Sequence, residues 1–282
     1  MKISRMIEAD IDRLLPVREL DTHKGDYGKL LLLCGSRGYT GAATFATMGA
    51  LRTGAGLVYL CVPESIYTIV ASKLLEPVIF PMPDENGMLS ASAIDAIAGL
   101  LDITDAILIG PGLGKSTGTS QVLRWILANY NRPIVVDADG INMLCEHIDV
   151  LRGRTSPTIL TPHEGEFMRI GGDLQKGRIQ SAVDMAYQFN AIIVLKGYET
   201  VITDGVNIYL NPTGNPGMAV GGSGDVLAGI IVSMLGQKIP ALEAAACGAW
   251  LHGKAGDICA EQIGQYGMLP SDLLEVLPRL LK

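Results

Sequence analysis

Short, continuous apolar runs recur along the chain and alternate with longer stretches of helical periodicity. Runs of this kind, without polar alternation, are typical of strands buried on both faces of a parallel sheet. They predict seven strands, at Lys29–Cys34, Leu57–Val62, Pro77–Pro81, Ala106–Ile109, Ile134–Asp137, Thr158–Thr161 and Ile192–Leu195. The stretches between them predict helices at Thr44–Leu51, Ser90–Leu101, Thr119–Tyr130 and Gln175–Phe189. Strands and helices in this alternation predict an α/β fold with a doubly wound, mainly parallel sheet flanked by helices on both faces.

The pattern changes near Thr200. The segment TVITDGVNIYLNP predicts two strands around Asp204-Gly205, which is a hairpin signal. The remaining residues, as far as Lys282, are mainly helical in pattern. Because the sequence contains no linker, low-complexity tract or internal repeat, we expect a single domain over residues 1–282.

Composition narrows the class of protein further. The chain is 48% hydrophobic and 18% charged, which is ordinary for a globular protein, and its net charge is −7. With no basic stripe, no nucleic-acid partner is expected. The first residues carry acids and lack the apolar core of a secretory signal, and no apolar run approaches the roughly 20 residues of a membrane span. The five cysteines form no CxxC pair, which favours free, buried thiols in a reducing cytoplasm.

Glycine clusters follow several of the predicted strands. They are GSRGYTGAA after the first strand, GPGLG at Gly110–Gly114 and GGSGD at Gly221–Asp225. Ligands of an open α/β sheet bind beyond the carboxyl ends of the strands. Glycine at such a place lets the backbone come close to a ligand. The three clusters together predict a rim that holds a large anionic ligand.

The cluster at Gly221–Asp225 is the most informative one. It precedes an apolar helical pattern from Val226 to Leu235. Glycines at a helix start leave backbone N–H groups unpaired at the positive end of the helix dipole, which suits a phosphate group. Asp225 adds a carboxylate at the same point. This carboxylate is either a capping group of the helix or a general base that takes a hydroxyl proton during phosphoryl transfer.

A family resemblance rests on these motifs taken in order. GGSGDVLAGI resembles the anion-hole motif of ribokinase-like small-molecule kinases, in which the aspartate is the catalytic base. Residues 22 to 254 also contain HKGDYG, GYTGAA, GPGLG, VVDADGIN, LTPHEGEF and VLKGYETVI. This ordered set resembles the ADP/ATP-dependent NAD(P)H-hydrate dehydratases, both free-standing enzymes and the C-terminal half of bifunctional NAD(P)H-hydrate repair proteins.

The resemblance implies a lyase of metabolite repair. Such an enzyme would return the S form of hydrated NADH or NADPH (NADHX or NADPHX) to NADH or NADPH. Hydrolysis of ADP to AMP, or of ATP to ADP, would drive the reaction, with Mg²⁺ as cofactor. The implied chemistry is that of a kinase, because phosphorylation turns the hydroxyl of the hydrated ring into a good leaving group.

The resemblance also implies roles for particular residues. The hydrated dinucleotide would contact Ala42, Ala43, Gly112, His163 and Asp225, and Asp225 would be catalytic. The adenine nucleotide, ADP or ATP, would contact Lys196, Gly197, Tyr198, Glu199, Thr200, Gly222 and Gly224. Glu166 would help to hold Mg²⁺. Glu164 stands where many relatives have proline, and it adds a negative charge beside His163.

Each of these residues, and a few neighbours in the motifs, could instead have a purely structural role. The roles considered are a solvated surface lysine for Lys24 and Lys196, a polar loop residue for His163, turn residues for Asp137 and Asp139, and a helix-start acid for Glu166. The runner-up function is a ribokinase-like kinase of a vitamin-precursor alcohol, hydroxymethylpyrimidine or hydroxyethylthiazole. A third is a nucleotide-binding regulator without catalysis, which would not need Asp225.

Partners follow from the same resemblance. The epimerase half of the bifunctional proteins is absent from this sequence, so we expect functional coupling to a separate epimerase that handles the R form. By analogy we also expect a homo-oligomer, a tetramer, located in the cytoplasm. The sequence leaves open the choice between ADP and ATP and between NADHX and NADPHX.

Overall fold

A ten-stranded sheet organises the molecule, and the computed structural model describes residues 2–281 around it. Its order is β1-β12-β11-β10-β9-β8-β7-β2-β3-β4. The strands are β1 (Lys2–Arg5), β2 (Lys29–Leu33), β3 (Leu57–Pro63), β4 (Val78–Met82), β7 (Ala106–Ile109), β8 (Ile134–Val136), β9 (Thr158–Leu160), β10 (Ile192–Leu195), β11 (Val201–Thr203) and β12 (Asn207–Leu210). Only β11 runs antiparallel to its neighbours. The order reverses between β2 and β7, so the sheet is doubly wound, as predicted.

The apolar runs form strands because both faces of the sheet are covered. In β2, Leu30 and Leu32 pack into the core on one face, and Leu31 and Leu33 pack into the core on the other. All four side chains are fully buried. Successive side chains of a strand point to opposite faces, so a run without polar positions is the pattern that two covered faces require.

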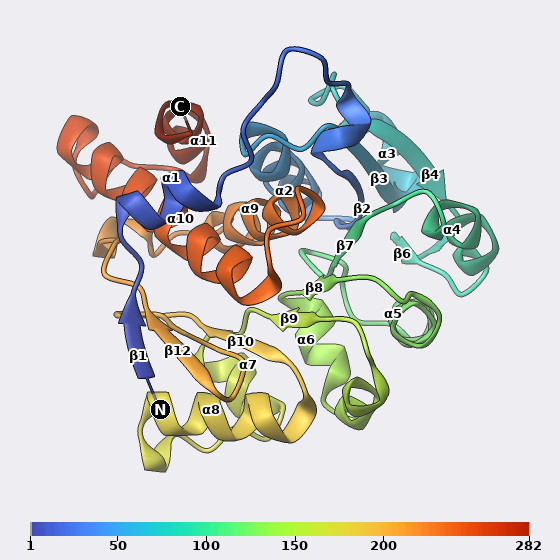
Figure 1. Cartoon of the computed structure of the whole chain (residues 1–282). Coiled ribbons are helices and arrows are strands. Elements are labelled where there is room, and N and C mark those ends of the chain that lie inside the picture. The colour runs from blue at the N-terminus through green and yellow to red at the C-terminus, as the bar shows by residue number, and fades with distance from the viewer. Residues whose placement is uncertain (1, 282) are drawn as a thin grey trace.

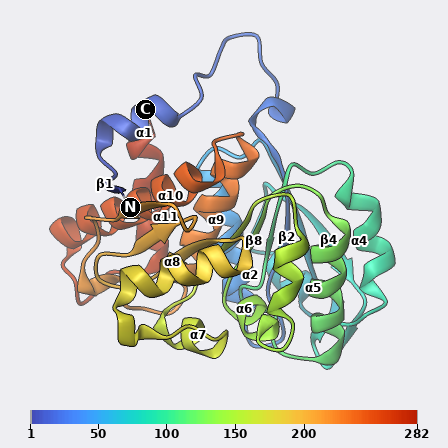
Figure 2. The ribbon, with the colours of Figure 1, turned by 60° about the horizontal axis from the view of Figure 1, so that its bottom comes forward.

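Two helical layers supply this cover (Figures 1 and 2). One layer contains α1 (Glu8–Leu14), α2 (Thr40–Arg52), α3 (Glu64–Ala71), α9 (Ser223–Gly236), α10 (Ala241–Ile263) and α11 (Pro270–Leu280). The other contains α4 (Ala93–Leu101), α5 (Thr117–Asn129), α6 (Asp139–Leu144), α7 (Glu164–Arg169) and α8 (Arg178–Phe189). Within the first layer α9 packs against both α2 and α10, and it lies on β2 and β7, the two strands between which the order reverses.

The predicted elements are confirmed, with shifts at their ends. The seven strands and the Asp204-Gly205 hairpin are present. The predicted helix at Gln175–Phe189 begins only at Arg178, because Gly177 (φ +83°) separates it from a short 3-10 turn. Similarly, α4 begins at Ala93 rather than Ser90, and α2 begins one turn early, at Thr40.

Three features were not predicted. Strand β1 and helix α1 precede the first predicted strand, and β1 pairs in parallel with β12. A small separate hairpin joins β5 (Asp84–Glu85) to β6 (Met88–Leu89) through the positive-φ pair Asn86-Gly87.

The cysteine prediction was right in part: four thiols are free and buried, whereas Cys145 is exposed.

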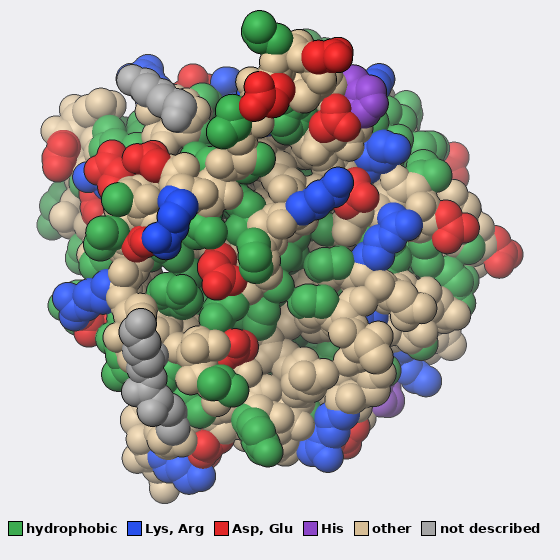
Figure 3. Space-filling view, viewed as in Figure 1, with side chains coloured by type: hydrophobic (Ala, Val, Ile, Leu, Met, Phe, Trp, Pro, Cys, Tyr) green, Lys and Arg blue, Asp and Glu red, His purple; other side chains and the backbone are tan. Residues whose placement is uncertain are grey.

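Charged side chains of both signs lie on the surface. Acidic and basic side chains are interspersed over the face drawn in Figure 3. In residues 2–281, the helices are all too short or too polar to cross a membrane.

Candidate active site

Several polar side chains meet where the parallel strands end. Asp137 follows β8, Thr161 follows β9 and Lys196 follows β10. The Asp137 carboxylate accepts a hydrogen bond from the Thr161 hydroxyl at 2.6 Å and pairs with the Lys196 ammonium at 3.0 Å. Lys196 Nζ also lies 3.9 Å from a carboxylate oxygen of Glu166. Lys196 is therefore held between two acids and is not a freely solvated lysine.

The first turn of α9 reaches the same point. Its N-cap is Gly222, whose φ of +97° favours glycine, and a Cβ there would lie 2.7 Å from the Phe45 ring of α2. The backbone N–H groups of Gly224 and Asp225 have no acceptor among residues 2–281. A Cβ on Gly224 would lie 3.5 Å from Lys196 Nζ. We call the two N–H groups and this ammonium the anion hole, because all three attract negative charge.

The Asp225 carboxyl titrates near neutral pH. Burial raises its pKa to about 7, the negative charges of Asp137 and Asp139 raise it as well, and the charge of Lys196 lowers it. At the N-terminus of α9 no side chain forms a capping hydrogen bond, so the capping role considered for Asp225 has no support here. A carboxyl that exchanges its proton near pH 7, beside an anion hole, is suited to general-base catalysis.

Lys196 stays charged in spite of its environment. Burial by itself would lower the pKa of the ammonium, but Asp137, Glu166 and Asp225 outweigh burial and raise it. The site therefore keeps a permanent positive charge next to the open end of α9. That charge offsets the acidic surroundings, which would otherwise repel a phosphate.

His163 and Glu166 form the start of α7. His163 Nδ1 accepts hydrogen bonds from the backbone N–H groups of Gly165 (3.0 Å) and Glu166 (3.3 Å). The Glu166 carboxylate accepts one from the His163 N–H at 2.9 Å. This reciprocal arrangement is a capping box, and half of the His163 side chain remains exposed on the rim. The Glu164 carboxylate pairs with the Arg178 guanidinium.

Two of the residues proposed for the dinucleotide, Gly112 and Ala42, lie close together. Gly112 has a φ of +61°, and a Cβ there would lie 2.7 Å from the Ala42 methyl group. A Cβ on Gly35 would lie 3.0 Å from the methyl group of Ala43. The Gly114 N–H in turn donates to the Asp139 carboxylate at 2.9 Å. The glycine loops after β2 and β7 therefore meet at the start of α2, next to the acids that surround Asp225.

The predicted nucleotide residues are less uniform in their surroundings. Gly222 and Gly224 lie at the start of α9, whereas Lys196 to Thr200 follow β10 in the loop that leads to β11. Arg178 holds this loop by donating hydrogen bonds to the carbonyls of Leu195 (2.9 Å) and Lys196 (3.1 Å). The Thr200 hydroxyl forms hydrogen bonds with the backbone N–H and carbonyl of Gly197 within the loop. The Tyr198 side chain is almost fully exposed. The Glu199 carboxylate instead pairs with Arg5 of β1 at 3.0 Å, so that side chain is directed to the edge of the sheet.

Sequence reasoning assigned no site role to several residues that lie here. Asp137 and Thr161 carry the same signal as the residues it chose, a polar side chain directly after an apolar strand. Cys34 is buried near Asp225 and Asp137, which help to raise the pKa of its thiol after burial itself. His252 of α10 lies within hydrogen-bond distance of Ser223, and nothing in the linear sequence marks that pairing.

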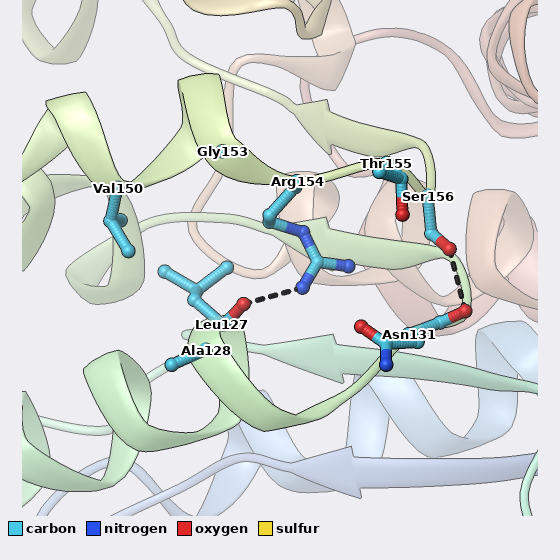
Figure 4. A pocket seen from close by; sticks show the side chains of 8 residues that line it. All are labelled: Leu127, Ala128, Asn131, Val150, Gly153, Arg154, Thr155 and Ser156. Atoms are coloured by element: carbon cyan, nitrogen blue, oxygen red, sulfur yellow. Dashed lines mark hydrogen bonds between the residues drawn. The ribbon is translucent and has the colours of Figure 1, made fainter.

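One cavity lies away from these residues. It measures about 240 Å³ and lies by the C-terminal end of α5 and the segment that enters β9, at the opposite end of the strands (Figure 4). Its Arg154 guanidinium is already bonded to main-chain carbonyls. A second, more open hollow lies on the outer side of α5. Neither borders the anion hole, so we place the candidate site by its chemistry and not by cavity size.

Curated proteins of similar sequence are NAD(P)H-hydrate repair enzymes. The chain is 44% identical over 275 residues to the bifunctional NAD(P)H-hydrate repair enzyme of Moorella thermoacetica, matching 95% of this chain and 52% of that protein. The chain thus spans about half the length of the curated relatives it matches.

Solved structures are similar to this chain in fold as well as in sequence. The ADP/ATP-dependent NAD(P)H-hydrate dehydratase of Bacillus subtilis, co-crystallised with ATP and Mg²⁺, is 31% identical, with a TM-score of 0.83 over 99% of this chain and 98% of that one. A ribokinase-like superfamily protein of Enterococcus faecalis is 26% identical, with a TM-score of 0.88 over 99% and 95%. The predicted ribokinase-like fold is confirmed. Residues 30–279 match the sequence model of the NAD(P)H-hydrate dehydratases, and the chain belongs to that family.

Proposed function

We propose that this chain dehydrates the S form of hydrated NADH or NADPH, driven by hydrolysis of ADP to AMP or of ATP to ADP. The observation that carries the proposal is the Asp225 carboxyl, with a pKa raised to about 7, beside the anion hole. Membership of the family and the likeness to the Bacillus subtilis enzyme support it. They do not favour the vitamin-precursor kinase, which was the runner-up.

The chemistry has two steps. Asp225 accepts the proton of the ring hydroxyl while the hydroxyl oxygen forms a bond to the terminal phosphorus, and the bond from that phosphorus to AMP or ADP breaks. The electron pair of the ring nitrogen then expels phosphate from the carbon, and loss of a proton from the neighbouring carbon restores the dihydropyridine. The Gly224 and Asp225 N–H groups and Lys196 stabilise the charge on the transferring group.

The donor set is suited to Mg²⁺. Mg²⁺ is commonly held by one or two carboxylates together with substrate phosphates. Asp137 and Glu166 are buried acids that both face Lys196 Nζ. We propose that these two carboxylates hold the ion, which when bound neutralises phosphate charge. Among residues 2–281 no group of three or more potential metal ligands exists, which fits an ion completed by the nucleotide.

The roles given to Ala42, Ala43, Gly112 and His163 for the dinucleotide, and to the Lys196–Thr200 loop, Gly222 and Gly224 for the nucleotide, belong to this proposal. So do a cytoplasmic location, a homo-oligomeric state and coupling to an epimerase. The names of the bifunctional relatives support the last of these.

The test is direct. Purified protein is incubated with hydrated NADH, Mg²⁺ and either ADP or ATP, and near-ultraviolet absorbance and orthophosphate are followed together. We expect NADH absorbance and orthophosphate to rise in equal amounts. A stable phosphorylated product without NADH absorbance would identify a kinase instead. Nucleotide binding without turnover would identify a regulator.

A further inference from the structure

The first turn of α9 lacks the usual anchor of a helix start. An N-cap side chain commonly accepts a hydrogen bond from one of the first N–H groups. Here the N-cap is Gly222, and the N–H groups of Gly224 and Asp225 find no acceptor among residues 2–281. A turn that keeps these donors open for a ligand needs a different means of fixing its orientation.

Ser223 supplies a contact on the other side of that turn. Its side chain is almost fully buried, and its hydroxyl lies 3.1 Å from His252 Nε2 on α10. The hydrogen bond leaves the backbone N–H groups of the turn untouched. It therefore ties the turn to the neighbouring helix without occupying the anion hole.

His252 itself has a well-fixed backbone. On the same turn of α10, the Trp250 carbonyl accepts a hydrogen bond from the Thr213 hydroxyl at 2.9 Å. The Ala249 carbonyl accepts one from the Asn211 side chain at 3.1 Å. Gly253 packs so tightly on Thr213 that a Cβ there would lie 2.2 Å from the Thr213 hydroxyl oxygen. The imidazole thus extends from a part of the helix that is bound to the segment after β12.

The imidazole is uncharged at neutral pH. Burial lowers the pKa of His252 to about 4; an interaction with the backbone of Ser223 raises the pKa in part, and the charge of Lys196 lowers it. A neutral imidazole has one donor and one acceptor nitrogen, so it pairs with a hydroxyl without adding positive charge beside Lys196. The hydrogen bond between His252 and Ser223 therefore adds no charge to the site.

We propose that His252 is a positioning residue that acts through Ser223. The pair fixes the first turn of α9, and with it the direction of the two open N–H groups and of the Asp225 carboxylate. This inference deepens the proposed function and rests on it for the effect on turnover. The effect on the helix itself does not depend on which reaction the site catalyses.

The test uses Ser223→Ala, His252→Leu, His252→Gln and the double variant Ser223→Ala/His252→Leu. The matched control is Ser233→Ala, also on α9, where a fully buried hydroxyl accepts a hydrogen bond from Gln237 at the other end of the helix. We measure kcat and KM with hydrated NADH, the dissociation constant of ATP, and amide hydrogen exchange at Val226, whose N–H closes the first turn on Gly222.

We expect Ser223→Ala and His252→Leu each to lower kcat about 10- to 100-fold, since a misplacement of about 1 Å costs up to roughly that much. KM and ATP affinity should change less than about threefold. The double variant should be no worse than either single one, because both remove the same contact. His252→Gln, whose amide again offers a donor and an acceptor, should recover most of the loss. Exchange at Val226 should accelerate in the first two variants and not in Ser233→Ala.

Two results would overturn the inference. One is a parent enzyme that turns over while Ser223→Ala keeps kcat within about twofold of Ser233→Ala. The other is unchanged exchange at Val226 in both single variants. If the parent fails to turn over hydrated NADH at all, the proposed function is wrong, and the exchange measurement alone decides whether the pair positions the turn.

Discussion

The Asp225 carboxyl lies between opposing influences. Lys196 favours its charged form, whereas burial and the carboxylates of Asp137 and Asp139 favour its neutral form. The balance leaves a pKa of about 7, close to the value at which a general base is both available and strong enough to take a proton.

Replacing Asp225 by Asn tests this assignment. Asn keeps the shape of the side chain but cannot accept the hydroxyl proton, so we expect kcat to fall by at least about 100-fold. ATP affinity should persist or increase, because a negative charge near the phosphates is removed. Steady-state kinetics and titration calorimetry check both effects. Turnover within a few-fold of the parent would leave Asp225 without a catalytic role.

The pKa of Asp225 also predicts how catalysis depends on pH. The base must be deprotonated, so kcat/KM should rise with pH and level off above about pH 7. A profile that is flat between pH 6 and 8 would contradict the assignment.

The free energy of unfolding should fall as pH rises, whereas kcat/KM should rise. The folded-state pKa lies above the ordinary value of 3.8, so the folded protein binds this proton more tightly than the unfolded chain does. Ionisation therefore costs stability progressively as pH rises from about 4 to 7, up to about 4 kcal/mol. We expect Asp225→Asn to melt at a higher temperature than the parent at pH 8 and at a similar temperature near pH 4. Calorimetric scans across that range measure the difference.

The surroundings of single residues are only partly readable from the sequence. Asp225 and Lys196 were proposed as site residues because they follow glycines or an apolar strand at the rim, and their roles stay predictions. The capping box of His163 and Glu166 was not predicted, although a helix-start acid was the simpler role considered for Glu166. Ionic partners such as Arg5 for Glu199 depend on strands that are far apart in the chain, and no local pattern reveals them.

Helix α5 ends on a buried cation. The Arg154 guanidinium donates to the carbonyls of Leu127 (2.7 Å), Tyr130 (2.8 Å) and Arg132 (3.0 Å), and to the Thr158 hydroxyl. The last carbonyls of a helix have no partner within the helix, and a positive charge there also suits the helix dipole. Burial lowers the pKa of this group, so the contacts stabilise it against a desolvation cost.

Arg154→Leu should therefore destabilise the fold by about 2–4 kcal/mol, because buried carbonyls lose their donors. Arg124→Leu, at an exposed position of the same helix, is the matched control and should change stability by less than about 0.5 kcal/mol. Urea unfolding measures both. The kcat of folded Arg154→Leu should stay near that of the parent, since the cavity lies at the far end of the strands from Asp225. Equal stability of the two variants would refute the capping role.

Elements with a strong local pattern were predicted well. Strands such as β2 and β7 are continuous apolar runs, and only burial on both faces makes that pattern favourable. Strand β1 was missed because KISR contains a single apolar residue, Ile3, which is half exposed at an edge of the sheet. The start of α8 was misplaced because glycine at residue 177 ends one turn and begins the next helix.

The whole molecule should respond to nucleotide. A ligand that binds only the folded state adds about 2.7 kcal/mol at 100 times its dissociation constant. For a chain of this size, that raises Tm by several degrees. We expect ADP or ATP with Mg²⁺ to give such a shift in differential scanning fluorimetry, and Lys196→Met to reduce it. An unchanged Tm with several millimolar ADP, ATP or AMP would argue against a nucleotide site.

The arrangement of the molecule was predictable in class but not in detail. Alternating strands and helices predict a doubly wound sheet, and the glycine clusters indicate which edge binds ligands. The packing of α10 on α9, which brings His252 to Ser223, depends on how the two helical layers close. No feature of the linear sequence specifies that approach.

The pairing of β1 with β12 also sets an order of events during synthesis. Lys2 to Arg5 pair with Asn207 to Leu210, so about 200 residues separate the partners. At about 5–20 residues per second on the ribosome, β1 waits roughly 10–40 s for β12 to be made. Such distant contacts form late and lengthen folding. The edge of the sheet beside β12 is therefore completed last, after the strands that carry Asp137 and Lys196 have been made.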